Sequence, residues 1–273
     1  MSEPFHLNDY LARIGFAAPL ATDLATLAAL QSAHVGAIPF EGFDPLFARP
    51  VKLDIASVQA KLVGSRRGGY CFEHNTLFKA ALEAIGFHVT GLGARVRWMS
   101  PPDAPLGPRE HMLLKVDLPQ GAFIVDVGFG ACVLETPLRL APGAEQATAM
   151  GTFKLTEADG LYWLHARQPE GWRVMYAFDL TPQIPADYAL ANWYTSTNPA
   201  APFLHMLIVE RLTPDKRYKL INTRFAVEAR DGAVVEERTL TSAGELAELL
   251  DKTFNVTFPV PAEDLFARIS APA

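Results

Sequence analysis

The sequence feature that most constrains the fold is the segment RRGGYCFEHN, residues 66–75, in which two glycines and a tyrosine precede Cys71. After Cys71, apolar residues recur at the spacing of one buried helix face until Gly86, which predicts a helix over residues 72–85. Cys71 is therefore expected at or just before the first helical turn, where unpaired backbone N–H groups and the helix dipole favour a thiolate over a thiol. This position makes Cys71 a candidate nucleophile, although isolated cysteines are more often small buried hydrophobic residues.

Length and charge exclude several classes of function. The chain has 273 residues, 49% hydrophobic and 20% charged, as expected for two or three globular domains. Its net charge is −6 and no Lys/Arg run is longer than Arg66-Arg67, which argues against an extended nucleic-acid surface but not against a local patch for one small anionic cofactor. The N-terminal segment lacks the pattern of a signal peptide, and no apolar run reaches membrane-spanning length. With two cysteines far apart in sequence, we expect a reducing cytoplasm.

Periodicity divides the chain into three segments. The first, residues 1–87, is mostly helical, with helices expected at 5–16, 23–36, 55–62 and 72–85. The second, residues 88–200, contains short strands without intervening helices, which suggests a small barrel or sandwich; strands are expected at 88–98, 111–118, 123–129, 152–155, 162–167 and 173–177, followed by a turn-rich linker at 192–199. The third, residues 201–273, mixes both; strands are expected at 205–212, 217–223, 224–229 and 255–260, with a turn at Asp231-Gly232 and a capped helix at 245–253.

A thiolate nucleophile needs an imidazole within hydrogen-bonding reach and a third group that orients the imidazole. His111 begins one predicted strand and Asp126 lies in the next, and an even-length loop centred on Pro119-Gln120 would place His111 and Asp126 on one face as diagonal neighbours. A carboxylate within the apolar segment FIVDVGF is costly to bury without a partner, and His111 is such a partner. The alternatives are a slip of one residue in register, or an Asp126 that points outward from a half-exposed strand.

The other thiol and the nearest histidine are weaker candidates. His74 follows Cys71 by three residues and is expected to pack or to cap the helix. Cys71 and His74 would supply only two metal ligands, whereas a structural zinc ion needs four, so we expect no metal. Cys132 follows the segment GFGA with no helix after it, so it is expected to be a packing residue.

Four motifs in order give the chain a resemblance that covers nearly its whole length. These are IPFE at 38–41, RRGGYCFE at 66–73, VDVGFG at 125–130 and NWYTSTNP at 192–199. Together with Cys71, His111 and Asp126, they resemble the arylamine N-acetyltransferases. The resemblance implies an α+β fold with a helical N-terminal bundle, a central β-barrel and a C-terminal α/β lid, the first two packed as in papain-like thiol enzymes.

The resemblance also implies an activity and a set of roles. The activity is ping-pong acetyl transfer from acetyl-CoA, through an acetyl-cysteine, to an arylamine, arylhydrazine or N-hydroxyarylamine. Cys71 would be the nucleophile, His111 the general base and acid, and Asp126 the orienting carboxylate. The implied partners are small molecules and acetyl-CoA, with no metal, nucleic acid or membrane, and the enzyme would be a monomer or homodimer. The expected binding residues are Phe40, Phe129 and Phe203 for the acceptor and Gly128 and Gly130 near the cofactor, although core packing would also explain any one phenylalanine.

The sequence departs from the family pattern at two places. Ala131 stands where many relatives have a glycine, and Gly42-Phe43 stands where Asn-Leu often follows IPFE, so the acceptor preference is open.

The glycines before Cys71 are expected to leave room for a thioester. Arg67 and Glu73 are expected to brace the glycine-rich turn, and any contribution to stability depends on their burial.

Three other hypotheses use the same residues. A thiol hydrolase or transglutaminase-like acyltransferase would use the Cys-His-Asp set on peptide or ester substrates. A biosynthetic amide synthase would use a longer acyl thioester. A binding module that has retained the fold would have no activity.

Overall fold

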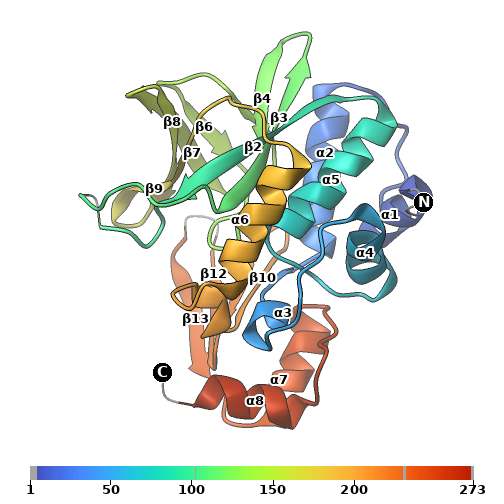
Figure 1. Cartoon of the computed structure of the whole chain (residues 1–273), viewed down its shortest axis with the longest axis vertical. Coiled ribbons are helices and arrows are strands. Elements are labelled where there is room, and N and C mark those ends of the chain that lie inside the picture. Colours follow the sequence, from blue (N-terminus) through green and yellow to red (C-terminus); the bar gives the residue numbers. More distant parts are fainter. Residues whose placement is uncertain (1–4, 102, 230–231, 272–273) are drawn as a thin grey trace.

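The computed structural model describes residues 5–101, 103–229 and 232–271. In Figure 1, the large curved sheet lies at the upper left, most N-terminal helices lie at the right, and the second sheet with the C-terminal helices lies below them. This confirms the predicted α+β class. In the described part of the chain, no helix is both long enough and apolar enough to cross a membrane.

The N-terminal helices form where the apolar spacing predicts them. Asp23 accepts a hydrogen bond from the Thr26 N–H and so caps the second helix, as expected. Gly86, with φ of +107°, ends the helix that begins at Cys71, because a left-handed residue is needed there. The helices are α1 (Leu7–Ile14), α2 (Leu24–Ala37), α3 (Phe43–Leu46), α4 (Ile55–Gln59), which continues into a π-helical turn at Ala60–Gly64, and α5 (Cys71–Ile85).

The central sheet is barrel-like and nearly closed. Its edge strands β5 and β6 are joined by Gln146, whose side-chain amide accepts from Arg139 N (2.7 Å) and donates to Arg139 O (2.9 Å). The strand order is β5-β4-β3-β2-β9-β8-β7-β6. The strands are β2 (His88–Val96), β3 (His111–Leu118), β4 (Gly121–Val125), β5 (Leu138–Arg139), β6 (Glu145–Thr148), β7 (Gly151–Ala158), β8 (Leu161–Gln168) and β9 (Gly171–Phe178).

The register of β3 against β4 decides where the predicted site residues lie. Leu118 pairs with Gly121 and Leu114 pairs with Val125, which leaves a loop of Pro119 and Gln120. This is the even-length loop expected from the sequence. Continued beyond Val125, the same register places Asp126 opposite Leu113 and therefore on the same face as His111.

The second sheet combines one strand from the N-terminal part of the chain with four strands from the C-terminal part. The short strand β1 (Phe40–Glu41) is its first strand and pairs antiparallel with β10, in the order β1-β10-β11-β12-β13. One core of buried apolar residues lies between this sheet and the last helices. The remaining elements are α6 (Pro185–Thr197), a 3₁₀ turn (Pro202–Leu204), β10 (Ile208–Leu212), β11 (Arg217–Ile221), β12 (Arg224–Glu228), β13 (Val234–Thr239), α7 (Ala243–Glu248), a π-helical turn (Leu249–Thr253) and α8 (Ala262–Ser270).

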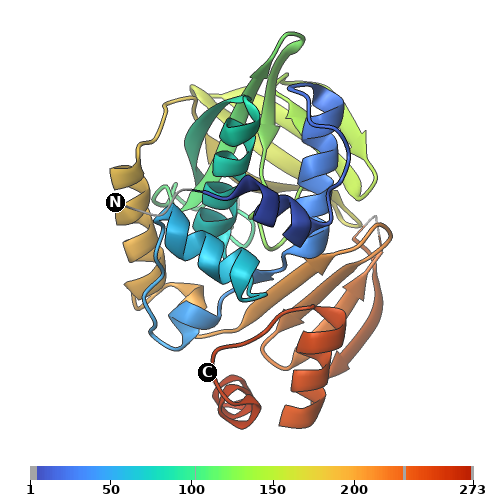
Figure 2. The ribbon, with the colours of Figure 1, turned by 90° about the vertical axis from the view of Figure 1, so that its right-hand side faces the viewer.

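Two local predictions were wrong. Most of residues 192–199, expected as a linker, belong to α6, because Pro185 starts a helix upstream and Asp187 accepts from the Ile184 N–H at its first turn. Residues 255–260 form no strand, since Asn255 has φ of +52° and Pro259 interrupts the segment; helix α8 follows instead. The predicted turn at Asp231-Gly232 includes Asp231, which lies outside the described residues. In Figure 2, α6 runs along one side of the molecule, beside the N-terminal helices.

Candidate active site

Cys71 is the first residue of α5, as the glycine-rich segment predicts. The helix start is stabilised by Glu73, whose Oε2 accepts from the Tyr70 N–H at 3.2 Å. The side chain of Cys71 is 6% exposed, and its Sγ lies 3.8 Å from the Glu110 carbonyl oxygen. The thiol is therefore held at the junction between the helical layer and the beginning of β3.

His111 and Asp126 meet as the predicted register requires. His111 Nε2 lies 2.7 Å from Asp126 Oδ2, and both side chains are buried. Because an ionised carboxylate can only accept, Nε2 carries the proton of this bond. The imidazole also interacts with the Cys71 thiol, and Nδ1 is the ring nitrogen left for that contact. The three candidate residues thus form one chain from thiol to imidazole to carboxylate.

Charge within this buried chain favours an imidazolium. Burial alone would lower the pKa of His111, but the charge and hydrogen bond of Asp126, with a further contribution from Cys71, raise the pKa instead. Burial would raise the pKa of Asp126, but His111 and the other donors hold it below its usual value. The geometry therefore stabilises a protonated imidazole next to the thiol, which is the arrangement that activates a cysteine nucleophile.

Three donors besides His111 hold the carboxylate of Asp126 in place. Its carboxylate also accepts from Tyr176 Oη at 3.0 Å, from Asn75 Nδ2 at 3.1 Å and from the Gly128 N–H at 2.9 Å. The sequence reasoning missed Asn75 and Tyr176. The spacing of Cys71 and Asn75, one helical turn apart, could have indicated Asn75, whereas Tyr176 on β9 has no motif around it.

Asn75 connects the helix to the barrel. Its Nδ2 lies within hydrogen-bond distance of the Cys71 carbonyl (3.2 Å) and the Met112 carbonyl (2.8 Å) in addition to Asp126, and its Oδ1 accepts from the Val127 N–H at 3.3 Å. These contacts tie α5, β3 and the segment after β4 to a single side chain. Asn75 is completely buried, so these partners replace the water that its amide would otherwise need.

The glycines around the site allow close packing. A Cβ on Gly68 would lie 2.0 Å from the Pro39 carbonyl oxygen, and one on Gly69 would lie 2.7 Å from Glu73 Oε2. The expectation that these two glycines leave room for a thioester was wrong, because protein atoms fill that space. A Cβ on Gly128 would lie 2.6 Å from Cys71 Cα, so this glycine lets the segment after β4 approach the nucleophile.

A cluster of buried ion pairs supports the glycine-rich turn. Arg67 contacts Glu41 (2.7 Å) and Asp44 (3.2 Å), while Lys61, in the π-helical turn, contacts Asp44 (2.6 Å) and Glu73 (2.7 Å). Arg67 and Glu73 therefore brace the turn through separate partners. Because Glu41 is buried, the loss of Arg67 would leave a carboxylate away from water with less compensating charge.

We expect Arg67→Met to lower the free energy of unfolding by about 3–5 kcal/mol, the usual cost of breaking a buried ion pair on one side. The measurement is urea unfolding followed by circular dichroism. Arg66→Met is the matched control, since Arg66 pairs with Asp251 where both side chains are exposed, and its loss should cost at most about 1 kcal/mol. Equal losses in the two variants would contradict a structural role for the buried cluster.

The predicted aromatic residues divide into two groups. The rings of Phe40 and Phe203 lie 6.0 Å apart, and Phe203 also meets Tyr70 at 5.5 Å. Phe129 instead packs edge-on against His111, with 5.2 Å between the ring centroids. Gly42 lies against Phe203, because a Cβ there would come within 3.2 Å of the Phe203 ring.

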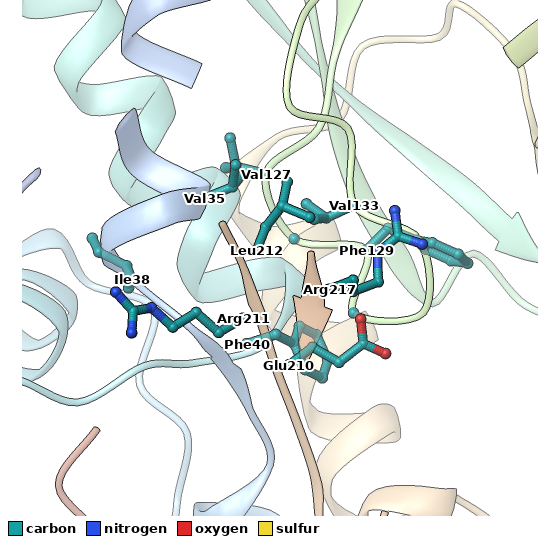
Figure 3. A pocket seen from close by; sticks show the side chains of 12 residues that line it. Val35, Ile38, Phe40, Val127, Phe129, Val133, Glu210, Arg211, Leu212 and Arg217 are labelled. Atoms are coloured by element: carbon teal, nitrogen blue, oxygen red, sulfur yellow. The ribbon is translucent and has the colours of Figure 1, made fainter. Parts of the chain in front are cut away.

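Phe40, Phe129, Gly128 and Gly130 line a small cavity beside the second sheet (Figure 3). Its volume of about 10 Å³ is room for about one water molecule. Glu210 and Arg217 also line it. A Cβ on Gly130 would lie 2.5 Å from the Phe40 ring, so the glycine is what allows the loop and the ring to touch. The site is thus closely packed on this side.

A larger cleft reaches the candidate base from the other side. It has a volume of about 380 Å³ and is lined by His111 and Phe72 together with residues of α6, among them Tyr188 and Trp193. Trp193 is 62% exposed, which places it at the mouth of the cleft. Arg109, which pairs with Asp179, and Asp187 also line it.

The other two candidates of the sequence, Cys132 and His74, are both buried. Cys132 is a buried free thiol, as expected, and burial raises its pKa. His74 is buried between α2 and the segment that carries Phe40. In the described part of the chain, His, Cys, Asp and Glu side chains form no group of three or more that could hold a metal ion.

The sequence and the structure match those of known proteins over nearly the whole chain. The profile of a family described as N-acetyltransferase matches residues 23–262. An arylamine N-acetyltransferase of Mycolicibacterium smegmatis is 38% identical over 97% of each chain. An arylamine N-acetyltransferase / N-hydroxyarylamine O-acetyltransferase of Salmonella typhimurium is 39% identical over 84% of this chain and 81% of its own. The structure of Mycobacterium marinum arylamine N-acetyltransferase in complex with CoA superposes with a TM-score of 0.91 at 36% identity, covering 97% of this chain and 98% of that one.

Proposed function

The chain belongs to the arylamine N-acetyltransferase family, and from that premise we propose that it transfers the acetyl group of acetyl-CoA to the nitrogen of an arylamine or arylhydrazine. The observation that carries the proposal is the buried chain formed by Cys71, His111 and Asp126. The name of the Salmonella relative supports oxygen acetylation of N-hydroxyarylamines as a further reaction.

The first half-reaction loads the enzyme. The Cys71 thiolate attacks the thioester carbonyl, a tetrahedral intermediate forms, and the CoA thiolate leaves with the proton that the His111 imidazolium donates. One thioester is exchanged for another, so the step is nearly balanced in energy. The backbone N–H of Cys71, in the first turn of α5, is the donor that we assign to the oxyanion.

The second half-reaction discharges the acetyl group. An aromatic amine is largely neutral at pH 7, so its nitrogen can attack the acetyl-Cys71 carbonyl directly. The amine loses a proton as the amide forms, and neutral His111 accepts that proton while the Cys71 thiolate leaves. Asp126 keeps the imidazole in one orientation and tautomer through both half-reactions.

The cleft beside α6 is the route by which we expect acetyl-CoA to approach. It is lined by His111, and its volume of about 380 Å³ suits a thioester arm better than the cavity of about 10 Å³ beside Phe40 does. The aromatic acceptor would then lie toward Phe40, Phe129 and Phe203, and the cavity of about 10 Å³ beside Phe40 would have to widen to admit a stacked ring. Gly42, which lets Phe203 pack close, would influence which acceptors fit.

Mass spectrometry of the protein after incubation with acetyl-CoA tests the proposal. We expect a single acetyl group on the peptide that contains Cys71, and its loss when an arylhydrazine is added. Cys132→Ala should carry the same adduct, because Cys132 is a buried thiol with a raised pKa. The absence of an adduct, an adduct elsewhere, or acylation only by a peptide or a longer acyl thioester would contradict the proposal.

A further inference from the structure

Behind the nucleophile, four residues form a buried line of hydrogen bonds that the proposed mechanism does not use. Tyr10 Oη lies 2.9 Å from His34 Nδ1, His34 Nε2 lies 2.9 Å from His74 Nδ1, and His74 Nε2 lies 3.1 Å from the Pro39 carbonyl oxygen. The two histidines and Tyr10 are at most 1% exposed. Three elements are thereby linked, since Tyr10 is on α1, His34 on α2 and His74 on α5.

The end of the line determines the direction of every bond. A carbonyl oxygen only accepts, so His74 Nε2 carries a proton and donates to Pro39. In a neutral ring Nδ1 of His74 then accepts from His34 Nε2, and His34 Nδ1 accepts from the Tyr10 hydroxyl. Burial lowers the pKa of both imidazoles, to about 4 for His74, which keeps them neutral at physiological pH. All ring nitrogens are satisfied in this single arrangement.

The residue that follows Pro39 is Phe40, and the same histidine contacts it. The rings of Phe40 and His74 are stacked, with an interplanar angle of 6° and 6.4 Å between centroids. The neighbouring Glu41 N–H donates to the Gly69 carbonyl at 2.8 Å, which fixes the other end of this short segment to the glycine-rich turn. His74 thus holds Phe40 both through the preceding carbonyl and through its ring.

We propose that His74 is a positioning residue for the second half-reaction, because it fixes the Phe40 ring at the place where an aromatic acceptor stacks. His74 lies one turn after Cys71 on α5, so the nucleophile and the aromatic wall are positioned from the same helix. The donor thioester approaches from the cleft beside α6, which His74 does not line. The effect of His74 should therefore fall on the acceptor and not on acetyl-CoA. This inference rests on the proposed function.

The test separates the two half-reactions and two acceptors. Acetyl-enzyme is prepared from acetyl-CoA, and its discharge is followed with phenylhydrazine and with methylhydrazine, which share the nucleophilic group and differ in the aromatic ring. In His74→Phe, we expect discharge to phenylhydrazine to slow about three- to tenfold, the equivalent of one neutral hydrogen bond, relative to methylhydrazine. The rate of Cys71 acetylation should change less than about twofold.

Two further variants keep the test decisive. His74→Gln can retain a donor for Pro39 and an acceptor for His34 while it removes the stacked ring, so it should shift the ratio in the same direction if His74→Phe does not fold. Tyr10→Phe removes only the far end of the line and should leave the ratio unchanged. If a folded His74 variant shows an unchanged ratio of the two discharge rates, or an equal loss of rate in both half-reactions, this inference is overturned and the proposed function is not affected. A wild-type protein that forms no acetyl-Cys71 would overturn the proposed function and the inference with it.

Discussion

Replacing Cys71 by serine is expected to lower the rate of acetyl transfer by on the order of 10⁴-fold or more, as removal of a triad nucleophile does in other enzymes. The thiol is the group that accepts the acetyl, and a serine hydroxyl is a far weaker nucleophile beside an imidazole that is already protonated. Release of CoA in the presence of an arylhydrazine measures the rate.

Cys132→Ala is the matched control for the nucleophile. Cys132 is the second free thiol of the chain, and it is buried in the core of the barrel-like sheet. Turnover in this variant should remain within a few-fold of wild type, with circular dichroism confirming that both variants are folded. A Cys71→Ser protein that turns over at the wild-type rate would show that the chemistry does not pass through this thiol.

Asp126→Asn is expected to lower turnover by about 10⁴-fold, as the same change does in a serine protease triad. The carboxylate of Asp126 accepts from His111, Tyr176, Asn75 and Gly128. An amide has one oxygen, so its NH₂ group must face donors, and the imidazole loses the partner that sets its tautomer. The loss should appear in kcat and in the rate of Cys71 acetylation.

Asp117→Asn controls for a change of charge on the same hairpin. Asp117 is exposed at the far end of β3, where it pairs with Lys115, so its substitution should leave turnover within about twofold. Stability must be measured for both variants, because Asp126 is completely buried. A folded Asp126→Asn protein that changes only in the KM for the acceptor would contradict an orienting role.

The meeting of His111 and Asp126 was predictable because a strand has a period of two residues. The two-residue loop of Pro119 and Gln120 determines the register of the hairpin, and the register determines the shared face. The position of Cys71 was predictable for a similar reason, since the helical periodicity begins shortly after the two glycines that precede it. Local rules thus located the three residues, and the resemblance assigned their roles.

Contacts between distant segments were not predictable from such rules. Tyr176 reaches Asp126 from a strand with no distinctive pattern, and only the closure of the sheet brings the two together. The space next to Gly68 is filled by Pro39, which is remote in sequence. The reason for a glycine at this position could therefore not be predicted from the neighbouring residues. Helix α6 was missed because the motif NWYTSTNP shows no apolar buried face: the polar Asn192 and Thr195 are buried, whereas Trp193 is exposed.

The two-residue strand β1 has a consequence for the order in which the enzyme is assembled. Phe40 pairs with Glu210, and Glu41 with Val209, so a ring of the proposed acceptor wall is held by a strand made near the end of synthesis. Contacts between such distant positions form late, because the intervening chain must first be ordered. A nascent chain that has folded only its helices and barrel therefore holds the thiol, the imidazole and the carboxylate but not this edge of the acceptor wall. Selective acetylation is then a property that the polypeptide acquires only when its last sheet has folded.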